Sequence, residues 1–176
     1  MKKNWFDSKV KDFSLIGGYQ KPQLNDNSLK LDSNENYVLS KQFQNDIVSG
    51  ARKNSDVREY PLGGVERLIQ MISKFIKIPT SMIGIGNGSD QILDLILSNF
   101  ASKETKVLTS NPTFGFFEER CKLYSIPLIA IPFSNNMKLD VEKFIKESKN
   151  ADILYLDSPN NPTGFQFSKT EIKKLI

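Results

Sequence analysis

Hydrophobic positions recur at helical spacing in two stretches of the first half of the chain. The first covers 41–52, where Phe43, Ile47 and Val48 share one side and Ser40 can cap the start. The second follows a loop at 58–64, and its apolar residues are Val65, Leu68, Ile69, Ile72, Phe75 and Ile76. This spacing predicts an amphipathic helix in each stretch.

The second half alternates short apolar runs with helical patterns. We expect strands at 106–109, 128–131 and 153–156, and helices at 114–123 and 141–147. Ser168 and Glu171 form a capping box that opens a last helix. A further helix from Ser89 is apolar nearly all round, which predicts burial. Strands that alternate with helices form right-handed crossovers, so the expected fold is α/β, a mainly parallel sheet with helices in three layers.

Composition excludes several classes of function. With 39% hydrophobic and 25% charged residues among 176, the chain is typical of a soluble globular protein. Its charge of +4 comes from 24 basic residues scattered among 20 acidic ones, which does not indicate a nucleic-acid surface. No apolar run has the length of a signal core or a membrane span, so we expect a cytoplasmic protein without a membrane partner.

Cysteine and histidine usage narrows the chemistry further. The single cysteine, Cys121, cannot form an intrachain disulfide, and there is no histidine. We therefore expect no metal site and no serine–histidine hydrolase mechanism.

The segment Gly86-Asn87-Gly88-Ser89-Asp90 joins a flexible turn to a helix start, where free N–H groups and the helix dipole favour a phosphate. It lacks the Gly-Lys-Ser/Thr of a Walker A loop and the third glycine of a dinucleotide fingerprint. An ordinary capped turn is the alternative interpretation.

A second polar segment, Asp157 to Gly164, directly follows the last expected strand. Ligands bind beyond the carboxyl ends of strands in open α/β sheets, which is where this segment places the Asn161 amide. The Asn161-Pro162 bond is a candidate for the cis form, and a simple Asn-Pro turn is the alternative.

These segments, together with Leu31 to Asn36, resemble the class I/II aminotransferases that use pyridoxal 5'-phosphate. Within that class the chain most resembles histidinol-phosphate aminotransferases. The resemblance runs from about Gly18 to the last residue, in the family's order and spacing. It implies part of a fold type I transferase, with an N-terminal arm at 1–37, a small-domain helix at 38–55 and an incomplete cofactor-binding large domain at 56–176.

The resemblance also assigns cofactor-binding residues. Gly88, Ser89 and Asp90 match the loop that binds the cofactor phosphate, and Asn161 matches the donor to the ring hydroxyl. Phe114 stands where the family usually has a tyrosine that stacks on the pyridine ring, so it keeps the aromatic face and lacks the hydroxyl. Core packing of Phe114 is the alternative.

Three more residues match positions that act between subunits, which implies a homodimer for the full-length protein. Tyr60 matches a tyrosine that reaches the partner's cofactor phosphate, although packing beside Pro61 explains it equally well. Tyr19 and Asn34 match an arm that covers a small-molecule substrate, an amino acid or a phosphorylated keto compound. The family usually has proline where this chain has Tyr37.

The residues that perform transamination are not in this sequence. The family's cofactor-linked lysine, pyridinium-binding aspartate and carboxylate-binding arginine all follow the match to 159–164. Ser168-Lys169 is better explained as a helix cap, so we assign no catalytic residue.

We expect the first part of a glutamate-dependent histidinol-phosphate transaminase of histidine biosynthesis, inactive as it stands. A threonine-phosphate decarboxylase-like enzyme and a non-catalytic module from a truncated or split gene are the alternatives.

Overall fold

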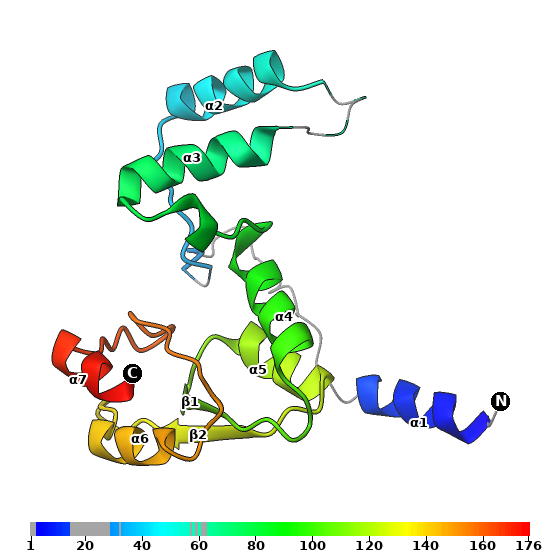
Figure 1. The fold of residues 1–176 in the computed structure, drawn as a ribbon, viewed down its shortest axis with the longest axis vertical. Helices are drawn as coiled ribbons and strands as arrows, with labels where there is room; N and C mark the ends of the chain where they lie inside the picture. Colours follow the sequence, from blue (N-terminus) through cyan, green and yellow to red (C-terminus); the bar gives the residue numbers. More distant parts are fainter. Residues whose placement is uncertain (1–2, 15–28, 32, 57, 59, 61–62) are drawn as a thin grey trace. The chain divides into compact units, whose positions relative to one another are not determined.

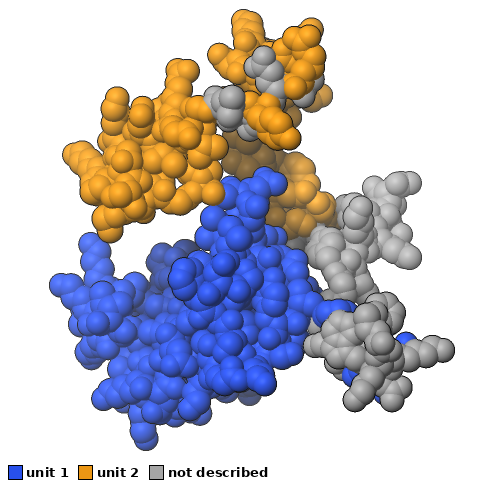
Figure 2. All heavy atoms as spheres, turned by 45° about the vertical axis from the view of Figure 1, so that its right-hand side comes forward, with its two compact units in different colours: residues 1–19, 86–176 blue, residues 20–85 orange. Residues whose placement is uncertain are grey.

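The computed structural model describes residues 3–14, 29–31, 33–56, 58, 60 and 63–176. The chain divides into two compact units, coloured separately in Figure 2. Unit 1 contains Met1–Tyr19 and Gly86–Ile176, and unit 2 contains Gln20–Ile85. The boundaries that we expect from the family resemblance, at 37 and 55, remain a prediction.

Unit 2 contains the two helices that the hydrophobic spacing predicts. Helix α2 (Lys41–Asn54) begins after Ser40, whose hydroxyl oxygen accepts a hydrogen bond from the Phe43 N–H at 3.1 Å. Helix α3 (Gly64–Ile76) leads to a short 3-10 turn, η1 (Thr80–Met82). Both predicted helices are confirmed, and each carries exposed apolar side chains.

Unit 1 begins with a helix that lies outside the elements expected above. Helix α1 (Lys3–Ser14) has Phe6, Val10 and Phe13 at helical spacing. Val10 and Phe13 are each about half exposed. The expected arm at 1–37 remains a prediction.

The remainder of unit 1 is an α/β fold, drawn from green to red in Figure 1. Its elements are α4 (Gly88–Phe100), β1 (Val107–Asn111), α5 (Gly115–Leu123), β2 (Leu128–Pro132), α6 (Val141–Ser148), β3 (Ile153–Leu154) and α7 (Lys169–Leu175). The strands are parallel in the order β2-β1-β3, with Val107 paired to Leu128 on one side and to Ile153 on the other. The predicted parallel sheet is confirmed.

Each face of the sheet has its own hydrophobic cluster, because successive side chains of a strand point to opposite faces. Val107 packs with Leu97 of α4 and Phe117 of α5 on one face. Leu108 packs with Phe144 of α6 on the other face, where α7 also contributes. The predicted three-layer arrangement is therefore confirmed, with β1 at its centre.

Helix α4 is less buried than its composition predicts. Leu97 is fully buried, but Leu95 is 48% and Phe100 is 77% exposed. Only one stripe of the helix packs against α5 and the sheet, so the prediction of a buried helix was wrong for this chain. In the part of the chain that the structure describes, no helix combines the length and the apolar character needed to cross a membrane.

A buried thiol and a partly buried tyrosine predict alkaline sensitivity. Burial, with a contribution from Glu118, raises the pKa of the Cys121 thiol from 9.0 to about 11. Burial also raises the pKa of Tyr155 from 10.0 to about 12. Above pH 9 the unfolded thiol loses its proton while the folded one keeps it, so the free energy of unfolding should fall as pH rises.

The test is denaturant unfolding of the chain at intervals from pH 8 to pH 11. We expect the fall attributable to the thiol between pH 9 and 11, the window set by its two pKa values. Cys121→Ala is the control, because it removes this titration and should flatten that part of the profile. Identical slopes in the two proteins would contradict the assignment.

Candidate functional site

The loops that follow β1 and β3 are tied together by one side chain, Asn160. Its Nδ2 group lies 3.3 Å from Ser110 Oγ, at the end of β1, and 3.1 Å from the carbonyl oxygen of Pro112. The same group lies 2.9 and 3.0 Å from the carboxylate oxygens of Asp157. Because Asn160 is only 4% exposed, these contacts are shielded from water.

The loop after β3 has a fixed backbone and an exposed Asn161 side chain. The Asn161 N–H donates to Asp157 Oδ2 at 3.0 Å, and the Gly164 N–H donates to the Asn160 carbonyl at 2.7 Å. Gly164 has φ 72°, a left-handed conformation that favours glycine. The Asn161-Pro162 bond is cis, as expected. Within the described structure the Asn161 amide makes no hydrogen bond, so it is free to contact a ligand.

Helix α4 begins with unsatisfied backbone donors. Asn87 precedes the helix without capping it through its side chain, whereas Ser40 and Asp140 cap α2 and α6. The first N–H groups of a helix have no partner within the helix. The Gly88 N–H donates to the Gly86 carbonyl at 3.0 Å, so the Ser89 and Asp90 N–H groups are the ones available to an anion, and both residues are exposed.

Two glycines shape the turn before α4. Gly88 has φ 80°, in the left-handed region. A Cβ atom on Gly86 would lie 2.5 Å from Cδ1 of Ile92, too close without a shift of that side chain. The left-handed backbone favours glycine at position 88, and a larger residue at position 86 would displace the Ile92 side chain.

Tyr155 directly follows β3 and packs against the hydrophobic cluster that contains Leu97 of α4 and Phe117 of α5. Its ring stacks on Phe117, with ring centroids 3.7 Å apart. After burial, the causes of its raised pKa are the carboxylates of Asp157 and Asp90. Both carboxylates therefore act on one tyrosine, although they come from different loops.

Phe114 lies between β1 and α5, as predicted, and it is partly exposed. Its ring centroid is 6.1 Å from that of Phe116, over which the Arg120 guanidinium lies at 4.7 Å. An aromatic face thus follows the β1 loop that Asn160 anchors. Beside it, the buried Thr113 hydroxyl has no hydrogen-bond partner in the described structure.

The residues expected to act between subunits lie in unit 2 or outside the described residues. Tyr60 is 88% exposed. Asn34 has φ 51° and lines a pocket of about 240 Å³. Tyr19 lies outside the described residues. The roles of these three residues between subunits remain predictions.

The pocket around Asn34 contains a small polar cluster. Lys30 Nζ and the Tyr37 hydroxyl each donate to the Glu35 carboxylate at 2.6 Å. The Lys30 hydrogen bond, followed by that of Tyr37, lowers the pKa of Glu35. Tyr37, which replaces the family's usual proline, thus reaches back to the same motif.

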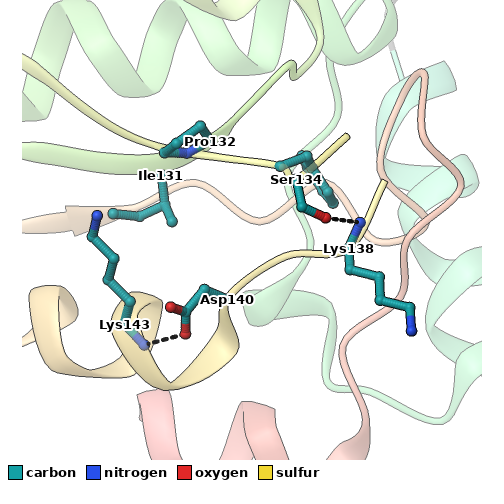
Figure 3. A pocket seen from close by; sticks show the side chains of 7 residues that line it. Ile131, Pro132, Ser134, Lys138, Asp140 and Lys143 are labelled. Atoms are coloured by element: carbon teal, nitrogen blue, oxygen red, sulfur yellow. Dashed lines mark hydrogen bonds between the residues drawn. The ribbon is translucent and has the colours of Figure 1, made fainter. Parts of the chain in front are cut away.

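A separate pocket of about 260 Å³ lies at the carboxyl end of β2 (Figure 3). The Lys143 N–H donates to Asp140 Oδ1 at 2.9 Å, and the Lys138 N–H donates to Ser134 Oγ at 3.2 Å. The Asp140 carboxylate therefore caps α6, and the Ser134 hydroxyl closes a turn, so both groups have a structural role. None of the residues predicted to bind the cofactor lines this pocket.

Sequence analysis selected Asn161 and missed Asn160. The missed signal was the spacing of Asn160 and Thr163, because asparagine side chains commonly accept from backbone a few residues later in turns. Here the Thr163 N–H donates to Asn160 Oδ1 at 3.1 Å, and the Thr163 hydroxyl donates to the same atom at 2.5 Å.

Comparison with known proteins supplies the deciding observation. A family model described as aminotransferase class I and II matches residues 23–176. The chain belongs to this family. Among class I and II aminotransferases, it is 33% identical over 162 residues to a histidinol-phosphate aminotransferase of Lactococcus lactis, a match that covers 92% of the chain and 44% of the relative.

Other relatives agree with this placement. A histidinol-phosphate aminotransferase of Pyrococcus furiosus is 31% identical over 147 residues, covering 83% of the chain and 43% of the relative. The crystal structure of the Clostridium acetobutylicum histidinol-phosphate aminotransferase matches with a TM-score of 0.60 and 28% identity, covering 76% of this chain and 38% of that chain.

A second structure supports the fold alone. The histidinol-phosphate aminotransferase of Sinorhizobium meliloti, solved in complex with pyridoxal-5'-phosphate, matches with a TM-score of 0.65 at 21% identity, over 73% of this chain and 35% of that one. The chain spans less than half the length of the aminotransferases it matches.

Proposed function

We propose that the chain is the N-terminal part of a pyridoxal-phosphate-dependent aminotransferase that moves an amino group from glutamate to imidazole acetol phosphate. The observation that supports this most strongly is the family match over 23–176, together with relatives named for histidinol phosphate. In the full-length protein we propose a cytoplasmic homodimer, with Tyr60, Tyr19 and Asn34 acting between subunits.

The residues of unit 1 fit the cofactor chemically. The uncapped start of α4 offers the Ser89 and Asp90 N–H groups to its phosphate, and Ser89 adds a hydroxyl, while Gly88 shapes the turn that precedes them. Asp90 repels an anion through its carboxylate, so it contributes its backbone only. Phe114 offers an aromatic face and Asn161 a free amide donor. The cofactor, when bound, supplies the electron sink for amino transfer.

The test measures binding and chemistry separately on the same chain. Equilibrium dialysis against pyridoxal phosphate should show saturable binding that inorganic phosphate weakens by competition. Glutamate-dependent amino transfer should not exceed that of free pyridoxal phosphate, since no lysine in these 176 residues matches the family's cofactor-linked lysine.

Two outcomes would contradict the proposal. If the chain shows no saturable binding of pyridoxal phosphate, it does not contain the proposed cofactor site. Turnover above the free cofactor, or stoichiometric labelling of one lysine such as Lys169 after borohydride reduction, would show that the nucleophile lies within the chain.

A further inference from the structure

Asn160 is one of the few buried polar residues in the described structure, and its orientation is determined by its neighbours. On the nitrogen side it meets only acceptors: Ser110 Oγ, the Pro112 carbonyl and the Asp157 carboxylate, at 2.9 to 3.3 Å. On the oxygen side it meets two donors, both from Thr163. A flipped amide would place oxygen against a carboxylate and a carbonyl, so one orientation is satisfied and the other is not.

The contacts of Asn160 connect two segments about fifty positions apart in the sequence. Pro112 lies two residues before Phe114, and Ser110 ends the buried part of β1. On the other side, Asp157 holds both the Asn160 amide and the Asn161 N–H. The aromatic loop and the loop that carries Asn161 therefore share one polar connection.

We propose that Asn160 is a positioning residue, whose buried amide locks the loop after β1 to the loop after β3 and thereby presents Phe114 and Asn161 to the cofactor in one geometry. This inference rests on the proposed function for its purpose, but the locking itself is a property of the free chain. Asn160 acts through its neighbours, whereas Asn161 contacts the ligand.

Locking matters because the Asn161 side chain has no other support. Its amide makes no hydrogen bond in the described structure, and only its backbone is held, by Asp157. A donor that must be ordered on binding loses affinity to conformational entropy, and a fixed backbone reduces that loss. Removal of the Asn160 amide should therefore weaken binding at a site that it does not touch.

The first measurement follows amide hydrogen exchange in the free chain. In Asn160→Ala, exchange should accelerate about tenfold or more at the non-proline residues of 160–165 and also at Phe117, whose N–H donates to the Phe114 carbonyl at 2.9 Å, since protection follows local opening. Asn136→Ala is the matched control, because Asn136 is exposed in the turn after β2 and makes no side-chain hydrogen bond in the described structure. Acceleration confined to 160–165 would overturn the proposed link.

The second measurement is a double-mutant cycle on pyridoxal phosphate affinity. Asn160→Ala and Asn161→Ala should each raise the dissociation constant about tenfold, and the double variant should raise it little further, because coupled residues are not additive. A merely structural role of Asn160 would give additive losses instead. Additive losses, or no loss in Asn160→Ala, would overturn the inference.

The two measurements separate this inference from the proposed function. If the chain binds no pyridoxal phosphate, or if Asn161→Ala binds as tightly as the parent, the proposed function fails while the exchange result still decides the locking role. If Asn160→Ala does not fold, Asp157→Asn is the milder variant, since it keeps the size of the side chain and leaves one of its two oxygens. It should accelerate exchange in both loops to a smaller extent, and unchanged exchange would overturn the link.

Discussion

Phe144→Ala is expected to destabilise unit 1 by about 3–5 kcal/mol, the range for truncation of a buried phenylalanine. Phe144 lies on α6 with no exposed surface, in the cluster that contains Leu108. Its ring centroid is 5.4 Å from that of Phe167, the residue that precedes the cap of α7. The substitution therefore leaves a cavity and removes an aromatic contact between α6 and the segment that leads into α7.

Phe100→Ala is the matched control for this prediction. It makes the same chemical change in a helix of the same unit, but Phe100 is 77% exposed. Its free energy of unfolding should stay within about 0.5 kcal/mol of the parent, as for most surface substitutions. Urea denaturation of both variants measures the difference. Equal losses in the two proteins would show that the cluster around Leu108 does not stabilise the chain.

The sequence predicted those elements whose hydrophobic spacing was complete within one segment. Helix α3 and the capping box of α7 were both predicted, and both are present. The parallel sheet followed from alternation alone, because a strand, a helix and a strand have few ways to pack. These features depend on residues close together in the chain.

The errors arose where an outcome depends on what packs against an element. The composition of α4 predicted burial, but burial depends on the surfaces available, and here Leu97 faces the sheet while Leu95 and Phe100 do not. In helix α1, Val10 and Phe13 stand at helical spacing, yet each is about half exposed. The hydrophobic pattern of a segment shows that the segment can be buried, but it does not show which surface is available to pack against it.

The candidate site shows the same limit at the level of single residues. The sequence pointed to the segment from Asp157 to Gly164, but it could not decide which asparagine is buried. Asn160 is enclosed because Ser110 and Pro112, about fifty positions earlier, supply its acceptors. That contact is long-range, so neither spacing nor turn propensity reveals it.

Asn161→Asp should produce the largest loss of cofactor affinity. Asn161 is exposed and its amide is free in the described structure, so the substitution changes the surface available to a ligand and leaves the core intact. In the proposed site the amide donates to the ionised ring oxygen of pyridoxal phosphate. An aspartate is ionised at pH 7 and cannot donate, so a charge-assisted hydrogen bond becomes a repulsion between like charges.

The expected result is a dissociation constant for pyridoxal phosphate that rises by a factor of about 10 to 1,000, since hydrogen bonds to charged groups contribute about 1.5–3 kcal/mol and repulsion adds to their loss. Gln166→Glu is the control, because it makes the same amide-to-acid change at an exposed position two residues after the segment from Asp157 to Gly164. Equilibrium dialysis at pH 7 should show near-parental affinity for this control. If Asn161→Asp binds within about threefold of the control, the Asn161 amide does not contact the cofactor, because a lost charged hydrogen bond costs more than that.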